Sequence, residues 1–247
     1  MAKKIAWANY FTDELDDAKD YGIQTQCGLT GSWNDAQIQM SVIIPFHFMP
    51  GEDPEWPWKT VANNKRAGLL VKEALESKNP LRLGIALHTL QDTYSHQGFS
   101  GWREDRNSCY VWYAPLSAIP NVGHAEMRTA PDVVSEVWTD PRGEKTKVKN
   151  SDRAMKAAAR TFQVLAQWNG TTNAAASWRA LKPSVRQAFT TSDYDKRKSK
   201  IMALGGDNKT RFSSVSRSLN GDKPAFAQAA FAHLLTAMSL VKNLPRH

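Results

Sequence analysis

The chain has 247 residues, a formal net charge of +8, 41% hydrophobic residues and 23% charged residues. This composition is typical of a globular protein and excludes a disordered or fibrous one. Its two cysteines, Cys27 and Cys109, exclude a disulfide framework and a cysteine-rich zinc site. No apolar run approaches the ~20 residues that a membrane span needs, and the start MAKKIAWANYFTDE lacks the apolar core of a secretory signal. A cytoplasmic location is therefore the default expectation.

The charge is distributed unevenly along the chain. Residues 1–140 contain 12 Lys and Arg against 18 Asp and Glu, whereas residues 141–247 contain 20 against 6. An acidic part suits cations and a basic part suits phosphate-bearing partners, although Lys and Arg can also simply solvate the outer faces of helices. We expect one mainly α domain over residues 1–247, with a metal-binding part at 1–140 and a basic helical part at 141–247.

The N-terminal part predicts two helices separated by an apolar segment and a loop. The helices are expected over residues 3–20 and 58–77 from their apolar periodicity. Residues 36–49 (AQIQMSVIIPFHFM) are strongly apolar, and Pro45 argues against a long helix there, so a short β pair is expected near this segment. His47 lies between Phe46 and Phe48, where a lone histidine is usually a structural residue. Prolines then indicate a loop over residues 51–60.

A central helix is predicted between Asn79 and Gly98. Asn79 is a good N-cap, Pro80 suits the first helical position, and Gly98 stands where a left-handed cap would end the helix. The opposite flank is apolar, which predicts that the helix packs well on that side.

Three potential metal ligands recur at every fourth residue of this helix. His88, Asp92 and His96 drift only ~80° around the axis, so they project from one face. They also spread ~12 Å along it, too far for one ion to bind all three. Adjacent pairs can each hold an ion and the central carboxylate has two oxygens to share, so the row indicates one wall of a site for two metals. The alternative is a polar stripe that happens to contain two histidines.

The segment after the central helix is rich in aromatic residues. In residues 99–113, Phe99 and Trp102 are candidates to contact a substrate, although such a loop can also touch a lipid surface or pack as a lid. Further on, His124 follows a glycine and Asp132 follows Pro131, which predicts a helix through Trp138. An aspartate in a first helical turn is also favourable without any metal.

The basic part predicts further helices. They are expected over residues 151–168, capped by Ser151 and ending near Asn169 and Gly170, and over residues 172–190, 208–219 and 224–244. His233 lies within the last of these and is interpreted as a core or surface histidine rather than a ligand.

Four segments in this order carry a family resemblance. HTLQDTYSHQGFSG, with PFHFMPG upstream and a Gly-His and a Pro-Asp pair downstream, resembles a bacterial family of mostly helical proteins. That family is similar in turn to the zinc-dependent phospholipases C and the fungal zinc-dependent single-strand nucleases. The helix also resembles that of heterokaryon-incompatibility C proteins. The resemblance covers roughly residues 5–140 and implies a helical bundle that holds zinc.

The resemblance also implies a division of ligands between two ions. One ion would take Asp13, His47, His88 and Asp92, and the other would take His96, His124 and Asp132. Here His96 follows Asp92 more closely, and Asp132 lies further from His124, than the equivalent residues do in the relatives. The relatives hold a third ion through the N-terminal residue and an early histidine, but no histidine precedes His47, so two ions are expected.

The function implied is a metal-dependent hydrolase that cleaves a phosphodiester. His88, Asp92 and His96 would act through the bound metal. Zinc suits histidine and carboxylate ligands best, with iron or manganese as alternatives. Phospholipid is favoured slightly over nucleic acid as the substrate. One alternative is a non-catalytic helical binding protein whose fold the metal ions stabilise, and another is an effector that acts on a membrane surface.

Overall fold

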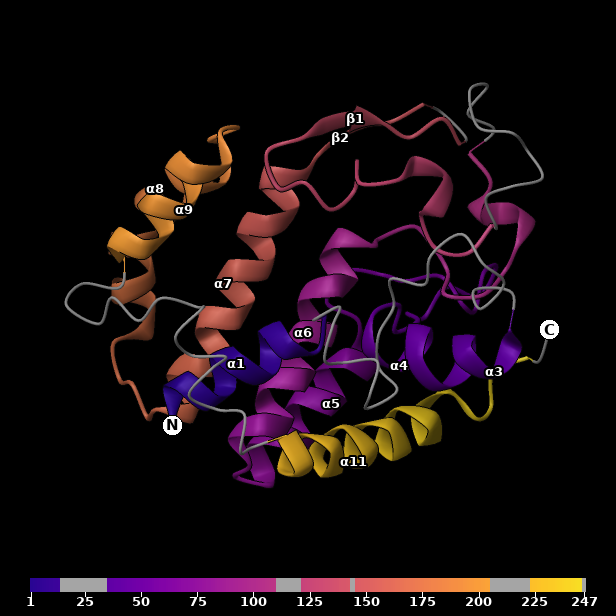
Figure 1. Cartoon of the computed structure of the whole chain (residues 1–247), viewed down its shortest axis with the longest axis horizontal. Helices are drawn as coiled ribbons and strands as arrows, with labels where there is room; N and C mark the ends of the chain where they lie inside the picture. Colours follow the sequence, from indigo (N-terminus) through magenta and orange to yellow (C-terminus); the bar gives the residue numbers. More distant parts are fainter. Residues whose placement is uncertain (14–34, 110–120, 143–144, 205–222, 246–247) are drawn as a thin grey trace.

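The computed structural model describes residues 1–13, 35–109, 121–142, 145–204 and 223–245, and these are mainly helical, as expected. Figure 1 shows helices arranged around a central one, α6, with a small two-stranded sheet at one end. In chain order the main helices are α1 (Ala2–Phe11), α5 (Lys65–Glu76), α6 (Pro80–Ser95), α7 (Asn150–Trp168), α8 (Ala174–Phe189), α9 (Tyr194–Leu204) and α11 (Lys223–Val241).

Helix α6 begins and ends where the sequence predicts. The Asn79 side chain accepts hydrogen bonds from the backbone N–H groups of Leu81 and Arg82, and Pro80 stands at the first position. The helix ends at Ser95, and Gly98 adopts a φ of +92°, which a residue with a side chain rarely adopts. Helices α1, α5, α7 and α11 all pack against α6. The helix that carries the candidate ligands is therefore the most enclosed element of the fold.

Three groups of buried residues surround α6. The first joins α5 and α6 to α7 and α11, through residues such as Leu70, Leu87 and Ala237. The second joins α1 to α6 and α11, where Phe226 packs edge-on against Trp7 and Phe11. The third lies beside the sheet and includes Phe48, Phe99, Val122, Trp138 and Val148. Helices α7 and α11, from the basic part of the chain, thus share one core with the acidic part.

The apolar segment at 36–49 is helical, so the expectation of a β pair there is wrong. A turn of α3 (Ala36–Ile38) leads into a π-helical turn over Gln39–Ile43 and then into α4 (Ile44–Phe46). Pro45 has no N–H to donate, and the wider π turn just before it lets the helix continue without that bond. Residues 42–49 are buried among the helices, so the continuous apolar character of this part reflects burial and not a strand.

The short β pair forms further along, where a helix was expected. Strand β1 (Val137–Thr139) pairs antiparallel with β2 (Lys147–Lys149), and residues 129–134 form turns instead of a helix that starts at Pro131. Asn150 is the physical reason, because its side-chain amide donates to the carbonyls of Ala130 and Val133. Its side-chain oxygen also accepts from the indole N–H of Trp138. These bonds hold the segment as a turn followed by a strand.

Several helix boundaries differ from the sequence expectation. Helix α1 ends at Phe11, and residues 14–20 of the expected helix lie outside the described residues, as does the helix expected at 208–219. Helix α5 begins at Lys65 rather than Trp58, because the Asn64 side chain caps it by accepting from Ala67 N–H. Ser151 lies inside α7 and does not cap it. The short 3₁₀ helices are η4 (Asp105–Asn107) and η5 (Ala125–Met127).

Helix α11 is the one described helix whose length and hydropathy would allow it to cross a membrane. A third of its apolar window is buried within the protein. His233 lies in that buried part, where its Nε2 lies 3.0 Å from the Pro45 carbonyl oxygen and its ring stacks on Phe46. Core helices pass the same length and hydropathy test; one side of α11 packs against α4, α5 and α6, while Phe231 and Leu235 are exposed.

Candidate metal centre

The three predicted ligands of the central helix lie in one row. His88 and Asp92 are on consecutive turns of α6, and His96 is the residue that follows its last turn. Asp92 lies in the middle: its Oδ2 is 3.2 Å from His88 Nε2 and 3.9 Å from His96 Nδ1. The same oxygen lies 2.9 Å from Nδ1 of His47, which comes from the segment after α4. One carboxylate therefore contacts the side chains of all three histidines.

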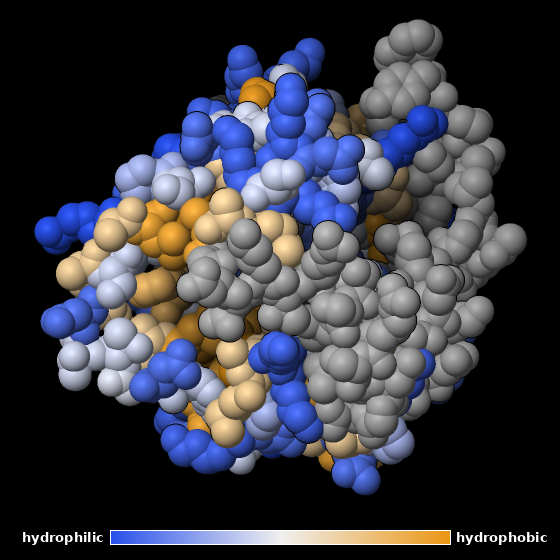
Figure 2. All heavy atoms as spheres, turned by 60° about the vertical axis from the view of Figure 1, so that its left-hand side comes forward, coloured by the Kyte–Doolittle hydropathy of each residue, from blue (hydrophilic) through white to orange (hydrophobic). Residues whose placement is uncertain are grey.

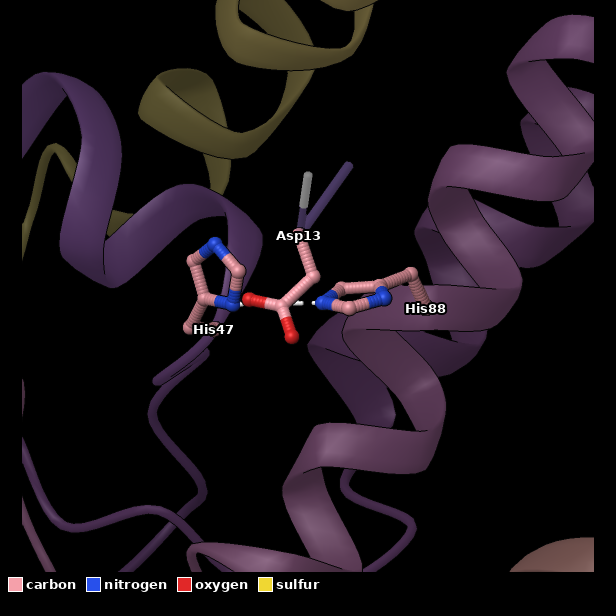
Figure 3. Close-up of side chains that lie close together, drawn as sticks. All are labelled: Asp13, His47 and His88. Atoms are coloured by element: carbon pink, nitrogen blue, oxygen red, sulfur yellow. Dashed lines mark hydrogen bonds between the residues drawn. The ribbon is translucent and has the colours of Figure 1, made fainter. Parts of the chain in front are cut away.

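The first group of possible ligands comes from three separate parts of the chain. Asp13 lies just beyond α1, His47 just beyond α4, and His88 in α6. Each offers one ligand atom, and these atoms lie within 4.8 Å of one another. Figure 3 shows the His47 and His88 rings pointing toward one another and toward the Asp13 carboxylate. His47 Nδ1 and His88 Nε2 are 3.2 Å apart.

A glycine in α6 brings Asp13 to this group. A Cβ atom at Gly84 would lie 2.5 Å from the carbonyl oxygen of Ile5 and 2.6 Å from Cβ of Ala8, so only glycine lets α1 approach α6 this closely. The Asn9 amide then donates to the Gly84 carbonyl and to the Gln91 side chain. This contact anchors the C-terminal end of α1.

The second group consists of His96, His124 and Asp132. Asp132 Oδ1 lies 3.4 Å from His96 Nε2 and 3.2 Å from His124 Nε2. The other ring nitrogen of each histidine meets a backbone carbonyl: Nδ1 of His96 is 2.9 Å from the His47 oxygen, and Nδ1 of His124 is 3.0 Å from the Arg128 oxygen. A carbonyl can only accept, so both Nδ1 atoms carry the proton and both Nε2 atoms are free to bind a metal.

Aromatic rings hold these two histidines in place. The Phe48 ring stacks on His96 at a centroid distance of 4.2 Å, and Phe99 packs edge-on against His124 at 5.8 Å. The Arg142 guanidinium lies 3.8 Å above the Phe99 ring.

Phe99 and Trp102, the residues expected to contact a substrate, both pack within the protein. Phe99 is fully buried between His124, Trp138 and Arg142, so its surface is already covered. Trp102 is half-buried and packs edge-on against Trp58 beside the first core group. Both rings therefore have a packing role.

The electrostatics of the site favour a bound cation. Burial opposes ionisation of Asp92, but its neighbours His88, His96 and His47 hold the pKa of its carboxyl far below the ordinary value. Partial desolvation likewise opposes ionisation of the half-exposed Asp132, but the contacts with His124 and His96 lower its pKa strongly. Burial disfavours charge on His96 as well, yet Asp92, Asp132 and the His47 carbonyl raise its pKa to about 9. Without a metal, a proton on His96 supplies the positive charge that these carboxylates require.

The donor atoms fit the coordination shell of a small divalent cation. Ligand bonds of the usual length for zinc, in a tetrahedral arrangement, place the donor atoms about 3.3 Å from one another. Four of the donor pairs, which involve His47 with Asp92, His47 with His88, and Asp132 with His96 and His124, are 2.9–3.4 Å apart, and the ligand atoms of each group all lie within 4.8 Å. Two imidazole nitrogens facing one another at 3.2 Å, as in His47 and His88, repel unless a proton or a cation lies between them.

The remaining histidine and cysteine of the described residues do not join these groups. His233 is buried against Pro45 and Thr89, and burial lowers its pKa to about 4, so it is a neutral structural residue as expected. Cys109 is buried with a pKa raised to about 12 by burial, and Cys27 lies outside the described residues.

The sequence analysis missed three residues that position the ligands. They are Gly84, Phe48 and Arg128. Gly84 was detectable, because a glycine inside a strongly predicted helix usually marks a close packing contact. Arg128 was not: its φ of +52° is unusual for a residue with a side chain, and it arises where the Arg128 carbonyl meets His124.

Comparison with known proteins gives one match. The model of a family of unknown function (DUF6765) matches residues 1–239. No curated protein and no solved structure matches the chain.

Proposed function

The chain belongs to DUF6765, a family of unknown function, and we propose that it is a metal-dependent hydrolase that cleaves phosphodiester bonds. Two ions, zinc for preference, would be bound: one by Asp13, His47, His88 and Asp92, and the other by His96, His124 and Asp132. The phospholipase C and nuclease resemblance supports the reaction class.

The position of Asp92 is the observation that carries the proposal. Its Oδ2 touches His47 and His88 of the first group and lies 3.9 Å from Nδ1 of His96, whose other ring nitrogen, Nε2, faces Asp132 in the second group. Asp92 is therefore placed to bind the first ion and to orient His96 for the second, which couples the two ligand groups, as is required where two ions act on one phosphoryl group. An isolated structural ion does not require a shared carboxylate.

Exposure of the carboxylates supports access by a substrate. The Asp132 side chain is 48% exposed and Asp13 is exposed, whereas His47 and His88 are buried. The buried histidines thus form the inner wall, and each group has one carboxylate at the surface. Closed structural sites seldom have such an open side.

The residues have distinct tasks in this proposal. The bound ions would lower the pKa of water and neutralise the phosphodiester. Asp92 contacts histidines of both ligand groups and so fixes the position of one group relative to the other. His96 and His124 are held in one tautomer by the carbonyls of His47 and Arg128, so their Nε2 lone pairs are oriented before any ion arrives.

Phospholipid is proposed as the substrate slightly ahead of single-stranded nucleic acid. Both carry a phosphodiester, and the basic charge of residues 141–247 suits either polyanion or an anionic membrane surface. Salt dependence separates them, because binding to nucleic acid weakens steeply as salt rises.

Metal content tests the proposal first. Protein purified without added metal would be analysed by elemental mass spectrometry, for the wild type and His88→Ala together. Two equivalents of zinc in the wild type and fewer in the variant are expected. Bis(p-nitrophenyl) phosphate, phosphatidylcholine vesicles and single-stranded DNA would then be offered as substrates. Absence of metal, even after zinc is offered and the excess removed, would overturn the proposal.

A structural role for the ions is the second candidate. It is favoured by the first group alone, because His47 and His88 are 3% and 9% exposed. Bound metal without hydrolysis of any of the three substrates, together with a large loss of thermal stability on chelation, would support this alternative.

A further inference from the structure

An open cavity of about 450 Å³ lies between α7, α8 and α9, with α6 forming part of its wall. This volume is within the range of small-molecule binding sites. Figure 2 shows apolar side chains around a hollow, with hydrophilic side chains above it. The lining residues are Gln91, Ser95, Ala154, Ala157, Ala158, Thr161, Phe162, Leu165, Trp178, Leu181, Val185, Phe189, Ile201 and Leu204.

Most of the side chains that line the cavity are apolar. Only Gln91, Ser95 and Thr161 among its lining residues are polar. The Gln91 amide donates to the Thr161 hydroxyl and its oxygen accepts from Asn9, so these polar groups are already used within the protein. Phe162 and Trp178 meet at a centroid distance of 5.5 Å and form an aromatic part of the wall. A molecule in this cavity would gain energy by burying hydrocarbon rather than by new hydrogen bonds.

Two of the helices that line the cavity, α8 and α9, are strongly basic. Residues 174–204, which contain α8 and α9, include seven Lys and Arg but only two Asp. Exposed Lys182 directly follows the lining residue Leu181, and Lys200 directly precedes the lining residue Ile201. An anionic group at the opening would be attracted by this charge.

We propose that this cavity binds the hydrocarbon tail of a single-chain anionic amphiphile, a long-chain fatty acid, with its carboxylate at the basic opening. The apolar walls of this open cavity match a flexible alkyl chain, and the excess of Lys and Arg on α8 and α9 matches a negative head group. The site uses no residue of the two metal-ligand groups, so it stands whether or not the metal-dependent hydrolysis is correct.

Binding of dodecanoate to the full chain tests this inference. Isothermal titration calorimetry below the micelle concentration would compare dodecanoate with dodecyltrimethylammonium, which has the same tail and the opposite charge. One equivalent of dodecanoate is expected to bind, at least tenfold more tightly than the cation. The intrinsic tryptophan fluorescence should change as dodecanoate binds, since the Trp178 side chain lines the cavity.

Two variants locate the binding site. Ala158→Trp fills the cavity, and Ile201→Asp places a negative charge at a lining position that is 40% exposed and therefore tolerant of substitution. Each should weaken dodecanoate binding at least tenfold. Gln167→Trp is the matched control, because it adds the same side chain to an exposed position of α7 outside the cavity.

Three results would overturn the inference. They are no saturable binding of dodecanoate, unchanged binding in Ile201→Asp, or equal affinity for the cationic amphiphile. Circular dichroism would establish that each variant is folded; if Ala158→Trp is not, Ile201→Asp alone decides the location. Since none of these measurements depends on metal or hydrolysis, failure here is distinguishable from failure of the proposed function.

Discussion

Oδ2 of Asp92 lies 2.9 Å from Nδ1 of His47, although the two residues are 45 positions apart in the chain. The same oxygen is 3.2 Å from Nε2 of His88, one helical turn before it. A carboxylate that two histidines contact in this way is stabilised as the anion, and its pKa is well below the ordinary value of an aspartate. The metal-binding capacity of both ligand groups is expected to depend on it.

Replacing Asp92 by Asn should therefore remove metal from both groups. The amide keeps the shape of the side chain but loses the negative charge, so zinc content should fall below half of the wild-type value. Phosphodiesterase activity should fall by about 100-fold or more, the range for loss of an electrostatic contribution to catalysis. Elemental mass spectrometry and bis(p-nitrophenyl) phosphate turnover measure the two effects. Asp53→Asn is the control, since Asp53 pairs with Lys59 outside both groups. Wild-type zinc content in Asp92→Asn would contradict the assignment.

Replacing His124 by Gln should affect only the second group. His124 contacts Asp132 but is not part of the first group, so one equivalent of metal should remain out of two. Activity should nevertheless be lost, because both ions are needed for the proposed reaction. Loss of both equivalents would show that the two groups do not bind independently.

Replacing Gly84 by Ala should separate α1 from α6. The added Cβ would lie 2.5 Å from the Ile5 carbonyl oxygen and 2.9 Å from the Asn9 nitrogen, so the backbone of α1 must move. We expect the free energy of unfolding to fall by about 2 kcal/mol, as for overpacking elsewhere, and zinc affinity to fall because Asp13 moves with α1. Urea denaturation and zinc titration measure these changes.

Gly68→Ala in α5 is the matched control for that substitution. A Cβ at Gly68 would meet nothing within 4 Å. Alanine favours a helix over glycine, so this variant should be more stable than the wild type by about 0.5–1 kcal/mol. Equal effects of the two substitutions would show that the close approach at Gly84 does not matter.

His233 should make the protein sensitive to acid. Its pKa in the folded state is lowered to about 4 by burial, below the ordinary value of 6.5. The unfolded chain therefore binds a proton first, so the stability that His233 contributes is present above pH 6.5 and is lost as the pH falls toward 4. Urea denaturation at pH 7 and pH 4.5 should show that wild type loses about 2 kcal/mol more than His233→Gln between the two values. Equal losses would mean that His233 does not titrate in this way.

The sequence was sufficient for the features that depend on neighbouring residues. The limits of α6 follow from Asn79, Pro80 and Gly98, and the common face of His88 and Asp92 follows from the helical repeat. These features are local, so an isolated segment already contains the information. The family resemblance added Asp13, His47, His124 and Asp132, and the structure brings all four into the two groups.

The tertiary structure decided the features that depend on distant partners. The apolar segment at 36–49 shows no clear helical period because residues 42–49 are all buried among the helices, and periodicity is informative only where one face meets water. Asn150 holds residues 130–138 as a turn and strand, although Pro131 alone favoured a helix. Likewise, the row of ligands along α6 becomes part of two ligand groups through contacts with distant segments. Gly84 lets α1 pack closely against α6, and backbone carbonyls orient His96 and His124. Such contacts join segments far apart in the chain, and their energy exists only once the core has packed.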